Sequence, residues 1–201
     1  MAITKKSPAK KAPSKKSPVR KSVPAKKSSR PRADATTLLA KDHKDVKALF
    51  KRYDKLTKAE ADGSERQELA EQICQMLTVH ATIEEEIFYP AVREADVDED
   101  LLDEAEVEHA SAKDLIGQIQ SMSPDDDLYD AKVTVLGEYI NHHVEEEEGE
   151  MFPKARKAID VREVGMELAA RKAELARHFD DEPPRAAARK KPPVARAARS
   201  S

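Results

Sequence analysis

The feature that most constrains this chain is a histidine pattern that occurs twice at helical spacing. A lone histidine is followed 34 to 37 residues later by a His-x-x-x-Glu pair, and the whole pattern then repeats. Residues four apart lie on one face of an α-helix, one turn apart. Each pair therefore presents an imidazole and a carboxylate to the same side. The residues of the pattern are His43, His80, Glu84, His109, His143 and Glu147.

Each of these histidines lies on the apolar stripe of its own helix. Leu39 and Val46 flank His43 at steps of four and three residues, and Ala105 and Ala112 flank His109 in the same way. Apolar residues at these steps face the core of a helical protein. Four helices would therefore direct an imidazole towards one interior.

The pattern predicts an all-α fold, an antiparallel up-down four-helix bundle with an additional C-terminal helix. Turns rich in Gly, Ser, Pro and Asp separate the bundle helices, and short loops favour antiparallel neighbours. A Ser64/Gln67 capping box predicts the start of the second helix, and Ser123-Pro124 that of the fourth. The second helix should end or kink at Pro90.

Charge divides the chain into a body and two tails. Residues 1–33 hold 12 Lys and Arg and no acid, residues 183–201 hold 6 and no acid, and the body between them has a net charge of −21. Proline and like charge favour disorder in both tails. The predicted organisation is a basic tail at 1–33, the bundle at 34–160, a packing helix at 161–182 and a second basic tail at 183–201.

Composition excludes several classes of protein. The single cysteine, Cys74, excludes an internal disulfide and is expected to be a small core residue. No run of 18 apolar residues exists, so we expect no membrane span. Because no apolar segment lies near Met1, we expect no secretory signal and a cytoplasmic protein.

Burying four imidazoles and two carboxylates together is costly unless something compensates for it. The cost is several kcal/mol for each uncompensated ion. A pair of metal ions removes it by direct ligation, and bridging carboxylates favour iron or manganese. Six ligands exceed the four of a structural zinc site. The pattern therefore predicts a dinuclear centre.

Two neighbouring positions leave alternatives. His142 precedes His143, but only His143 keeps the ten-residue distance to the following proline that His80 has to Pro90. We therefore expect His142 to face solvent or to lie behind the site. Tyr53 could reach the site, although packing in the core with its hydroxyl satisfied is the expected outcome.

At these residues the chain resembles the hemerythrin-like, or HHE cation-binding domain, family. The resemblance covers roughly residues 37–158 and implies two non-haem irons with an oxo or hydroxo bridge. It implies one iron on His43 and His80, the other on His109 and His143, and Glu84 and Glu147 bridging them. Oxygen-carrying members have a further histidine one turn after the third-helix ligand. This chain has Lys113 there, which argues against reversible oxygen carriage.

The resemblance implies a di-iron protein that binds or responds to O2, NO or peroxide. A di-iron oxidoreductase that consumes peroxide or NO is an alternative, and the residues do not decide whether the protein is an enzyme. A metal-free acidic interaction protein with basic arms is a further alternative. The 12 cations of residues 1–33 favour non-specific contact with DNA, with the acidic body as a competing partner. No membrane partner is expected, and the oligomeric state is left open.

Overall fold

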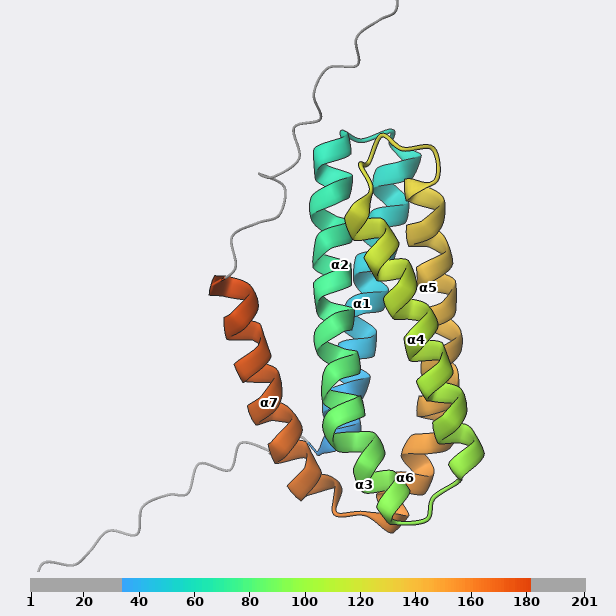
Figure 1. Ribbon diagram of the computed structural model, residues 1–201, viewed down its shortest axis with the longest axis vertical. Coiled ribbons are helices and arrows are strands. Elements are labelled where there is room, and N and C mark those ends of the chain that lie inside the picture. Colours follow the sequence, from blue (N-terminus) through green and yellow to red (C-terminus); the bar gives the residue numbers. More distant parts are fainter. Residues whose placement is uncertain (1–33, 182–201) are drawn as a thin grey trace, which may run out of the picture. The chain divides into compact units, whose positions relative to one another are not determined.

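The computed structural model describes residues 34–181, and all regular structure in that range is helical (Figure 1). The predicted tails at 1–33 and 183–201 lie outside the described residues. None of the described helices is long and apolar enough to cross a lipid bilayer. The elements in chain order are α1 (Ala35–Lys58), α2 (Gly63–Ile83), η1 (Glu84–Phe88), α3 (Tyr89–Glu94), α4 (Glu99–Ser121), α5 (Tyr129–Glu146), η2 (Glu147–Met151), α6 (Phe152–Ala158) and α7 (Val161–Asp181).

The predicted antiparallel bundle is confirmed. The helix α1, the continuous run α2–η1–α3, the helix α4 and the run α5–η2–α6 are its four members (Figure 1). The helix α1 packs against α2 and α5, and α4 packs against α5 and α2. Every histidine of the repeated pattern therefore comes from a different bundle helix.

Two π-helical turns, η1 and η2, carry the second and fourth helices past a proline. Pro90 has no N–H to donate to the carbonyl four residues back, and its ring crowds that carbonyl. The chain widens instead, and the Tyr89 N–H bonds to the Glu84 carbonyl five residues back. Phe152 bonds to Glu147 in the same way before Pro153. The helix thus continues through the proline rather than ending there.

The predicted capping box at the start of α2 is wrong. The helix begins at Gly63 with Asp62 as its N-cap, and Oδ1 of Asp62 accepts the Ser64 N–H at 2.8 Å. An N-terminal Asp satisfies an otherwise free backbone donor at least as well as Ser does. Gln67 instead donates to Glu71 on the same helix.

The predicted helix start at Ser123-Pro124 is also wrong, because α5 begins later, at Tyr129. The side chain of Asp126 accepts the Ser123 N–H at 2.8 Å and holds this segment as a turn. The start of α5 is fixed by tertiary contacts: Tyr129 is buried, and Asp130 accepts two hydrogen bonds from Arg66. These partners come from elsewhere in the chain and outweigh the local signal.

The helix α7 packs outside the bundle against α1 and α2, as expected. Asp160 caps it: Oδ1 of Asp160 accepts the backbone N–H of Arg162 at 3.0 Å and that of Glu163 at 3.2 Å. Leu168 is fully buried, Lys172 pairs with Asp42 on α1, and Arg171 makes two hydrogen bonds to Glu86 on η1. Leu168, the partly buried Val164 and Leu175 beside it, and two ion pairs therefore fix α7 to the bundle.

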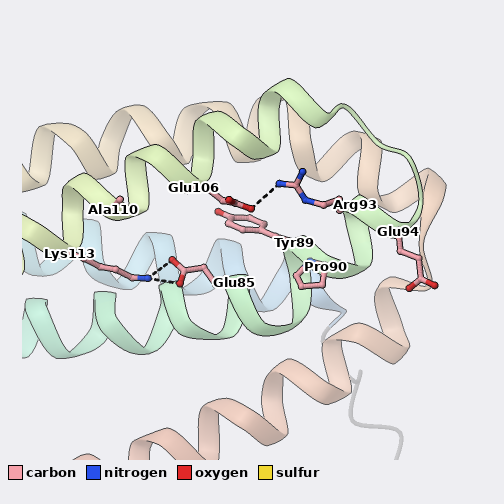
Figure 2. A pocket seen from close by; sticks show the side chains of 8 residues that line it. All are labelled: Glu85, Tyr89, Pro90, Arg93, Glu94, Glu106, Ala110 and Lys113. Atoms are coloured by element: carbon pink, nitrogen blue, oxygen red, sulfur yellow. Dashed lines mark hydrogen bonds and ion pairs between the residues drawn. The ribbon is translucent and has the colours of Figure 1, made fainter.

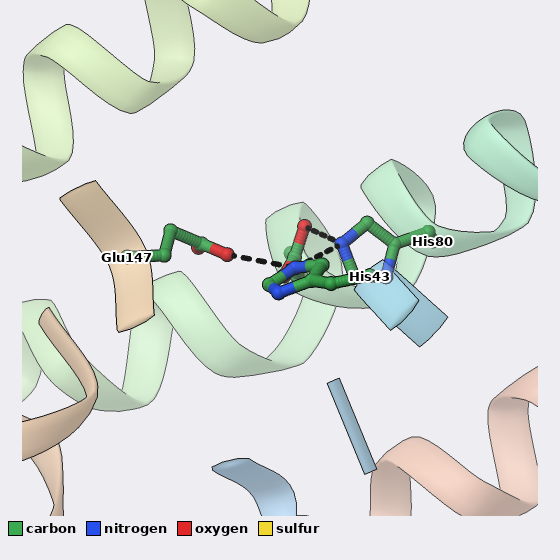
Figure 3. Close-up of side chains that lie close together, drawn as sticks. His43, His80 and Glu147 are labelled. Atoms are coloured by element: carbon green, nitrogen blue, oxygen red, sulfur yellow. Dashed lines mark hydrogen bonds and ion pairs between the residues drawn. The ribbon is translucent and has the colours of Figure 1, made fainter. Parts of the chain in front are cut away.

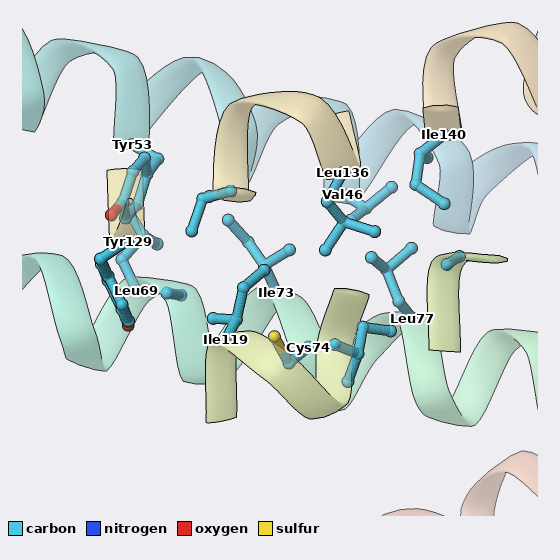
Figure 4. Packing of buried hydrophobic residues seen from close by; sticks show 14 of the residues in the cluster. Val46, Tyr53, Leu69, Ile73, Cys74, Leu77, Ile119, Tyr129, Leu136 and Ile140 are labelled. Carbon is cyan, nitrogen blue, oxygen red and sulfur yellow. The ribbon is translucent and has the colours of Figure 1, made fainter. Parts of the chain in front are cut away.

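The interior contains two apolar clusters with a polar layer between them. One, drawn in Figure 4, surrounds Ile73 and Leu136, and the other surrounds Leu39 and Phe88. On α1, His43 falls between Leu39 of one cluster and Val46 of the other. On each of the other three helices the histidine also lies between the two clusters. The candidate ligands therefore form one layer with an apolar cluster on either side.

Candidate metal centre

The structure brings all six residues of the repeated pattern into this polar layer. The four imidazoles come from α1, α2, α4 and α5, and the two carboxylates are the first residues of η1 and η2. Their exposed fractions run from 0 to 7%. Buried charge-bearing groups at this density need partners or a metal. The residues are His43, His80, Glu84, His109, His143 and Glu147.

The first group of candidate ligands joins the first histidine pair to both glutamates. Figure 3 shows three of its members, His43, His80 and Glu147. Nε2 of His43 lies 3.0 Å from Nε2 of His80 and 3.2 Å from Oε2 of Glu147. Nε2 of His80 lies 3.1 Å from Oε2 of Glu84. These ligand atoms all lie within 4.8 Å of one another, a spacing that could hold one metal ion.

The second group consists of the other histidine pair and Glu84. Nε2 of His109 lies 3.2 Å from Nε2 of His143 and 3.5 Å from Oε2 of Glu84. Glu147 is 3.6 Å from Nε2 of His143. Each glutamate therefore faces a histidine of each pair, and the two candidate positions share their carboxylates.

Three buried carboxylate oxygens in this layer have no hydrogen-bond partner within the described residues. They are both oxygens of Glu84 and Oε2 of Glu147. An unsatisfied buried acceptor costs about 1–3 kcal/mol, and more when it is charged. Hydrogen bonds within the cluster therefore leave these oxygens without partners, and a bound metal ion could ligate them.

Each imidazole turns its Nε2 inward and its Nδ1 towards a further carboxylate. Such carboxylates orient metal-ligating histidines and make them more basic. These four carboxylates are sequence neighbours of the pattern residues. Two directly precede the lone histidines, and two directly follow the glutamates. The pairs are Asp42 with His80 at 3.6 Å, Glu85 with His109 at 2.9 Å, Glu108 with His143 at 2.8 Å and Glu148 with His43 at 2.9 Å.

These four carboxylate partners were not predicted from the sequence pattern. The side chain of Glu148 is 45% exposed, yet it pairs with His43. The available signal was the repeat itself. The residue before the lone histidine pairs with the next helix in both halves, as Asp42 and Glu108 do.

The carboxylates set the charge of the buried groups. Burial disfavours the charged imidazole of His80, but the facing carboxylates of Glu84 and Asp42 raise its pKa to about 10. Burial alone would raise the pKa of Glu147, yet the imidazoles of His143 and His43 lower it to about 2. Against the opposing effect of burial, Glu147 and Glu108 also raise the pKa of His143, whereas burial lowers the pKa of His109, so the imidazoles of this layer differ in charge.

Tyr89 reaches the site, and Tyr53 does not. The Tyr89 hydroxyl donates to Oε1 of Glu147 at 3.0 Å and lies 3.2 Å from Nε2 of His109. Phe152, in the equivalent place of the other half, stacks on His43 at 5.7 Å. Tyr53 packs in the apolar cluster and donates to Asp130, as expected.

Lys113 occupies the position at which oxygen carriers of the resembled family have a fifth histidine. Its ammonium group pairs with both oxygens of Glu85, the carboxylate that holds His109 (Figure 2). Lys113, Glu85 and Tyr89 line a surface groove of about 740 Å³ between η1–α3 and α4. The lysine therefore acts on the centre through Glu85.

A small cavity borders the four imidazoles on the side of the first apolar cluster. Its volume is about 20 Å³, enough for about one water-sized molecule. Apart from the imidazoles and Lys113 its walls are hydrocarbon, from residues such as Leu77 and Ile140. Such a space suits a small uncharged molecule.

His142 lies outside the layer, as expected. Its side chain is 64% exposed and faces Glu108 at 3.6 Å and Glu146 at 3.4 Å. Glu108 also contacts His143, so His142 is connected to the candidate ligands only indirectly, through Glu108.

Comparison with known proteins decides the family. The model of the hemerythrin HHE cation binding domain matches residues 34–155, which include all six residues of the pattern. The chain belongs to the hemerythrin HHE cation-binding family. This family binds metal cations, and the two His/Glu groups of this HHE domain could hold them.

Two relatives place the HHE domain in context. It is 34% identical over 119 residues to a protein named DNA nickase from Nostoc sp., a match that covers 57% of this chain but only 31% of that relative. An HHE cation binding domain-containing protein from Mycobacterium kansasii has a similar crystal structure, with a TM-score of 0.60 and 23% identity. That match covers 72% of this chain and 88% of the other. At this identity it supports the shared fold.

Proposed function

We propose that this HHE domain holds two non-haem irons and uses them to bind or respond to O2, NO or peroxide. One iron would be held by His43 and His80, the other by His109 and His143. Glu84 and Glu147 would bridge them. The observation that carries this proposal is the convergence of four Nε2 atoms and two buried carboxylates in one layer.

The residues present fit a pair of metal ions. The unpartnered oxygens of Glu84 and Glu147 face imidazole nitrogens at 3.1–3.6 Å. Imidazole with bridging carboxylate is a donor set typical of dinuclear iron. Carboxylates 2.8–2.9 Å from Nδ1 orient three of the imidazoles with their other nitrogen available, as in metal-ligating histidines, while Nδ1 of His80 lies 3.6 Å from Asp42 without a hydrogen bond.

Bound iron would supply one-electron redox chemistry and affinity for small oxidants. The chain's own residues would supply position and selectivity. The two apolar clusters exclude water from the layer, and the cavity of about 20 Å³ limits the ligand to a very small molecule. Tyr89 would hold Glu147 in place through its hydroxyl.

A sensing or redox role is favoured over oxygen carriage. Oxygen carriers of the resembled family supply a fifth histidine, and this chain has Lys113, which is engaged with Glu85. One fewer protein ligand leaves a coordination position for exchange with small molecules. Steady turnover of peroxide or NO by the iron-loaded protein would shift the assignment to an oxidoreductase.

The test is metal analysis of the purified, iron-loaded protein with two matched variants. We expect close to two irons per chain, and charge-transfer absorption in the near ultraviolet when oxidised. His143→Ala should lose most of the metal, whereas His142→Ala should keep it. One iron per chain in the wild type, or the opposite order of the variants, would overturn the assignment.

We also propose that residues 1–33 contact nucleic acid without sequence preference. Twelve cations in that segment and the name of the Nostoc relative support this role. Each neutralised phosphate contributes about 0.9 to the slope of log K against log salt. If half of the cations engage, the slope should be about −5. Deleting residues 1–33 should remove most binding and leave iron content unchanged.

A further inference from the structure

The helix α1 carries a row of cations, which we call the lysine stripe: Lys44, Lys47, Lys51 and Lys55. They recur at steps of three and four residues and so lie along one side of the helix, spanning about 16 Å. Lys44, Lys51 and Lys55 are exposed, and Lys47 is half-buried. Lys47 and Lys51 line a groove of about 340 Å³ between α1 and α5, whose walls also include the carboxylates of Asp54 and Glu138.

These lysines lack carboxylate partners among the described residues, although acids far outnumber bases in the body. The internal repeat makes the contrast direct. Lys113 is one turn after His109 and pairs with Glu85. Lys47 is one turn after His43, and the corresponding carboxylate, Glu148, has no ion pair with it.

The stripe also reverses the local charge of the body. The helix α1 holds seven Lys and Arg against three Asp, while residues 34–182 together have a net charge of −21. A row of unpaired ammonium groups is complementary in charge to a regular array of anions. Lysine acts on phosphate as a point charge, without reading the sequence of bases.

We propose that the lysine stripe docks on the phosphate backbone of double-stranded DNA. The inference rests on the proposed nucleic-acid contact of residues 1–33, which directly precede α1, and adds a rigid surface to it. None of the large exposed hydrophobic side chains of the described residues, which are Val107, Leu128, Tyr139 and Met166, lies on α1. The stripe therefore lacks the apolar anchors of a protein–protein interface.

The test compares two variants of the full chain that remove equal charge. The first is Lys44→Gln/Lys51→Gln/Lys55→Gln, which empties the exposed part of the stripe. The second is Lys157→Gln/Arg162→Gln/Arg177→Gln, three exposed cations on α6 and α7 that have no carboxylate partner among the described residues. Binding to a short duplex is measured from low to moderate salt, with iron content and melting temperature as controls.

We expect the salt slope of the stripe variant to be smaller by about 2.7 than that of the wild type, from three phosphate contacts. The second variant should change it by less than 1. Should the triple substitution disturb the fold, Lys51→Gln alone should reduce the slope by about 0.9.

Equal changes in both variants would mean a general effect of net charge and overturn the proposal. Unchanged slopes with DNA binding intact would also overturn it, while leaving the contact of residues 1–33 in place. No salt-dependent binding by the wild type would overturn both. If the stripe variant instead dissociates a dimer seen by light scattering without DNA, the occupant is a second copy and not DNA.

Discussion

The hydroxyl of Tyr89 donates a 3.0 Å hydrogen bond to Oε1 of Glu147, which lies 58 residues further along the chain. The equivalent residue of the other half, Phe152, has no hydroxyl and stacks on His43 instead. The two candidate metal positions therefore differ, although the six candidate ligands repeat. The position beside His109 has a hydrogen-bond donor at its edge, and the position beside His43 has an aromatic ring.

We predict that Tyr89→Phe lowers the free energy of unfolding of the metal-free protein by about 1–3 kcal/mol, because Oε1 of Glu147 is left buried without its donor. Urea denaturation measures the change. Tyr139→Phe, at a tyrosine that is 49% exposed, should change it by less than about 0.5 kcal/mol. Equal unfolding midpoints for wild type and Tyr89→Phe would show that this hydrogen bond contributes nothing.

Metal affinity should separate the acids of the run Glu145–Glu150. Glu147→Ala should abolish most iron binding, since both candidate positions lose a carboxylate. Glu148→Ala should weaken affinity by roughly 10- to 100-fold, because it only orients His43. Glu145→Ala, at an exposed position, should have no effect. Iron titration with a competing chelator measures all three, and a Glu145 effect as large as that of Glu147 would contradict the geometry.

Iron should raise the melting temperature, because it binds the folded state through residues from four helices. At a free metal concentration 100 times the dissociation constant the gain is about 2.7 kcal/mol. For a chain of this size that corresponds to a shift of roughly 5–10 °C. Differential scanning fluorimetry with and without chelator measures it. Glu84→Ala is the control, and it should melt at the same temperature in both conditions.

Cys74 should be unreactive in the folded protein. Burial raises the pKa of its thiol to about 12, from an ordinary value of 9.0. At pH 8 the thiolate is then roughly a thousandfold scarcer than in the unfolded chain. A colorimetric thiol reagent should react quickly only after urea is added. Rapid labelling of the native protein would place Cys74 outside the core.

The same shift fixes the sign of a stability change at high pH. The folded thiol keeps its proton between pH 9 and 12, where the unfolded thiol loses it. The contribution of Cys74 to stability is therefore complete below pH 9 and is lost as the pH rises towards 12. Cys74→Ser should lack this component of the pH dependence in urea denaturation.

The sequence contains enough to predict the bundle and the convergence of the six residues. The spacing of His143 to Glu147, and its repetition at His80 and Glu84, is a local property that a helix converts into a shared face. The same periodicity placed Tyr53 in the core and His142 outside it. These predictions depend on one helix at a time.

The features that the sequence did not reveal depend on two helices at once. Glu108 pairs with His143 only because α4 and α5 approach closely, and the spacing within α4 does not contain that distance. Tyr89 faces the site because the π-helical turn before it changes the face on which the following residues lie. The start of α5 is decided by the bond between Arg66 and Asp130 rather than by Ser123.

The two π-helical turns make the centre sensitive to chain length as well as to residue identity. Each turn fits one more residue between the inward glutamate and the following aromatic residue than a regular α-helix would. Removing Glu86 would take out that extra residue and place Tyr89 four residues after Glu84, one regular α-turn later and on nearly the same face. A single-codon deletion that spares every candidate ligand would thus make Pro90 crowd a closed α-helical turn beside the centre, and it would remove the η1 partner of Arg171 on α7.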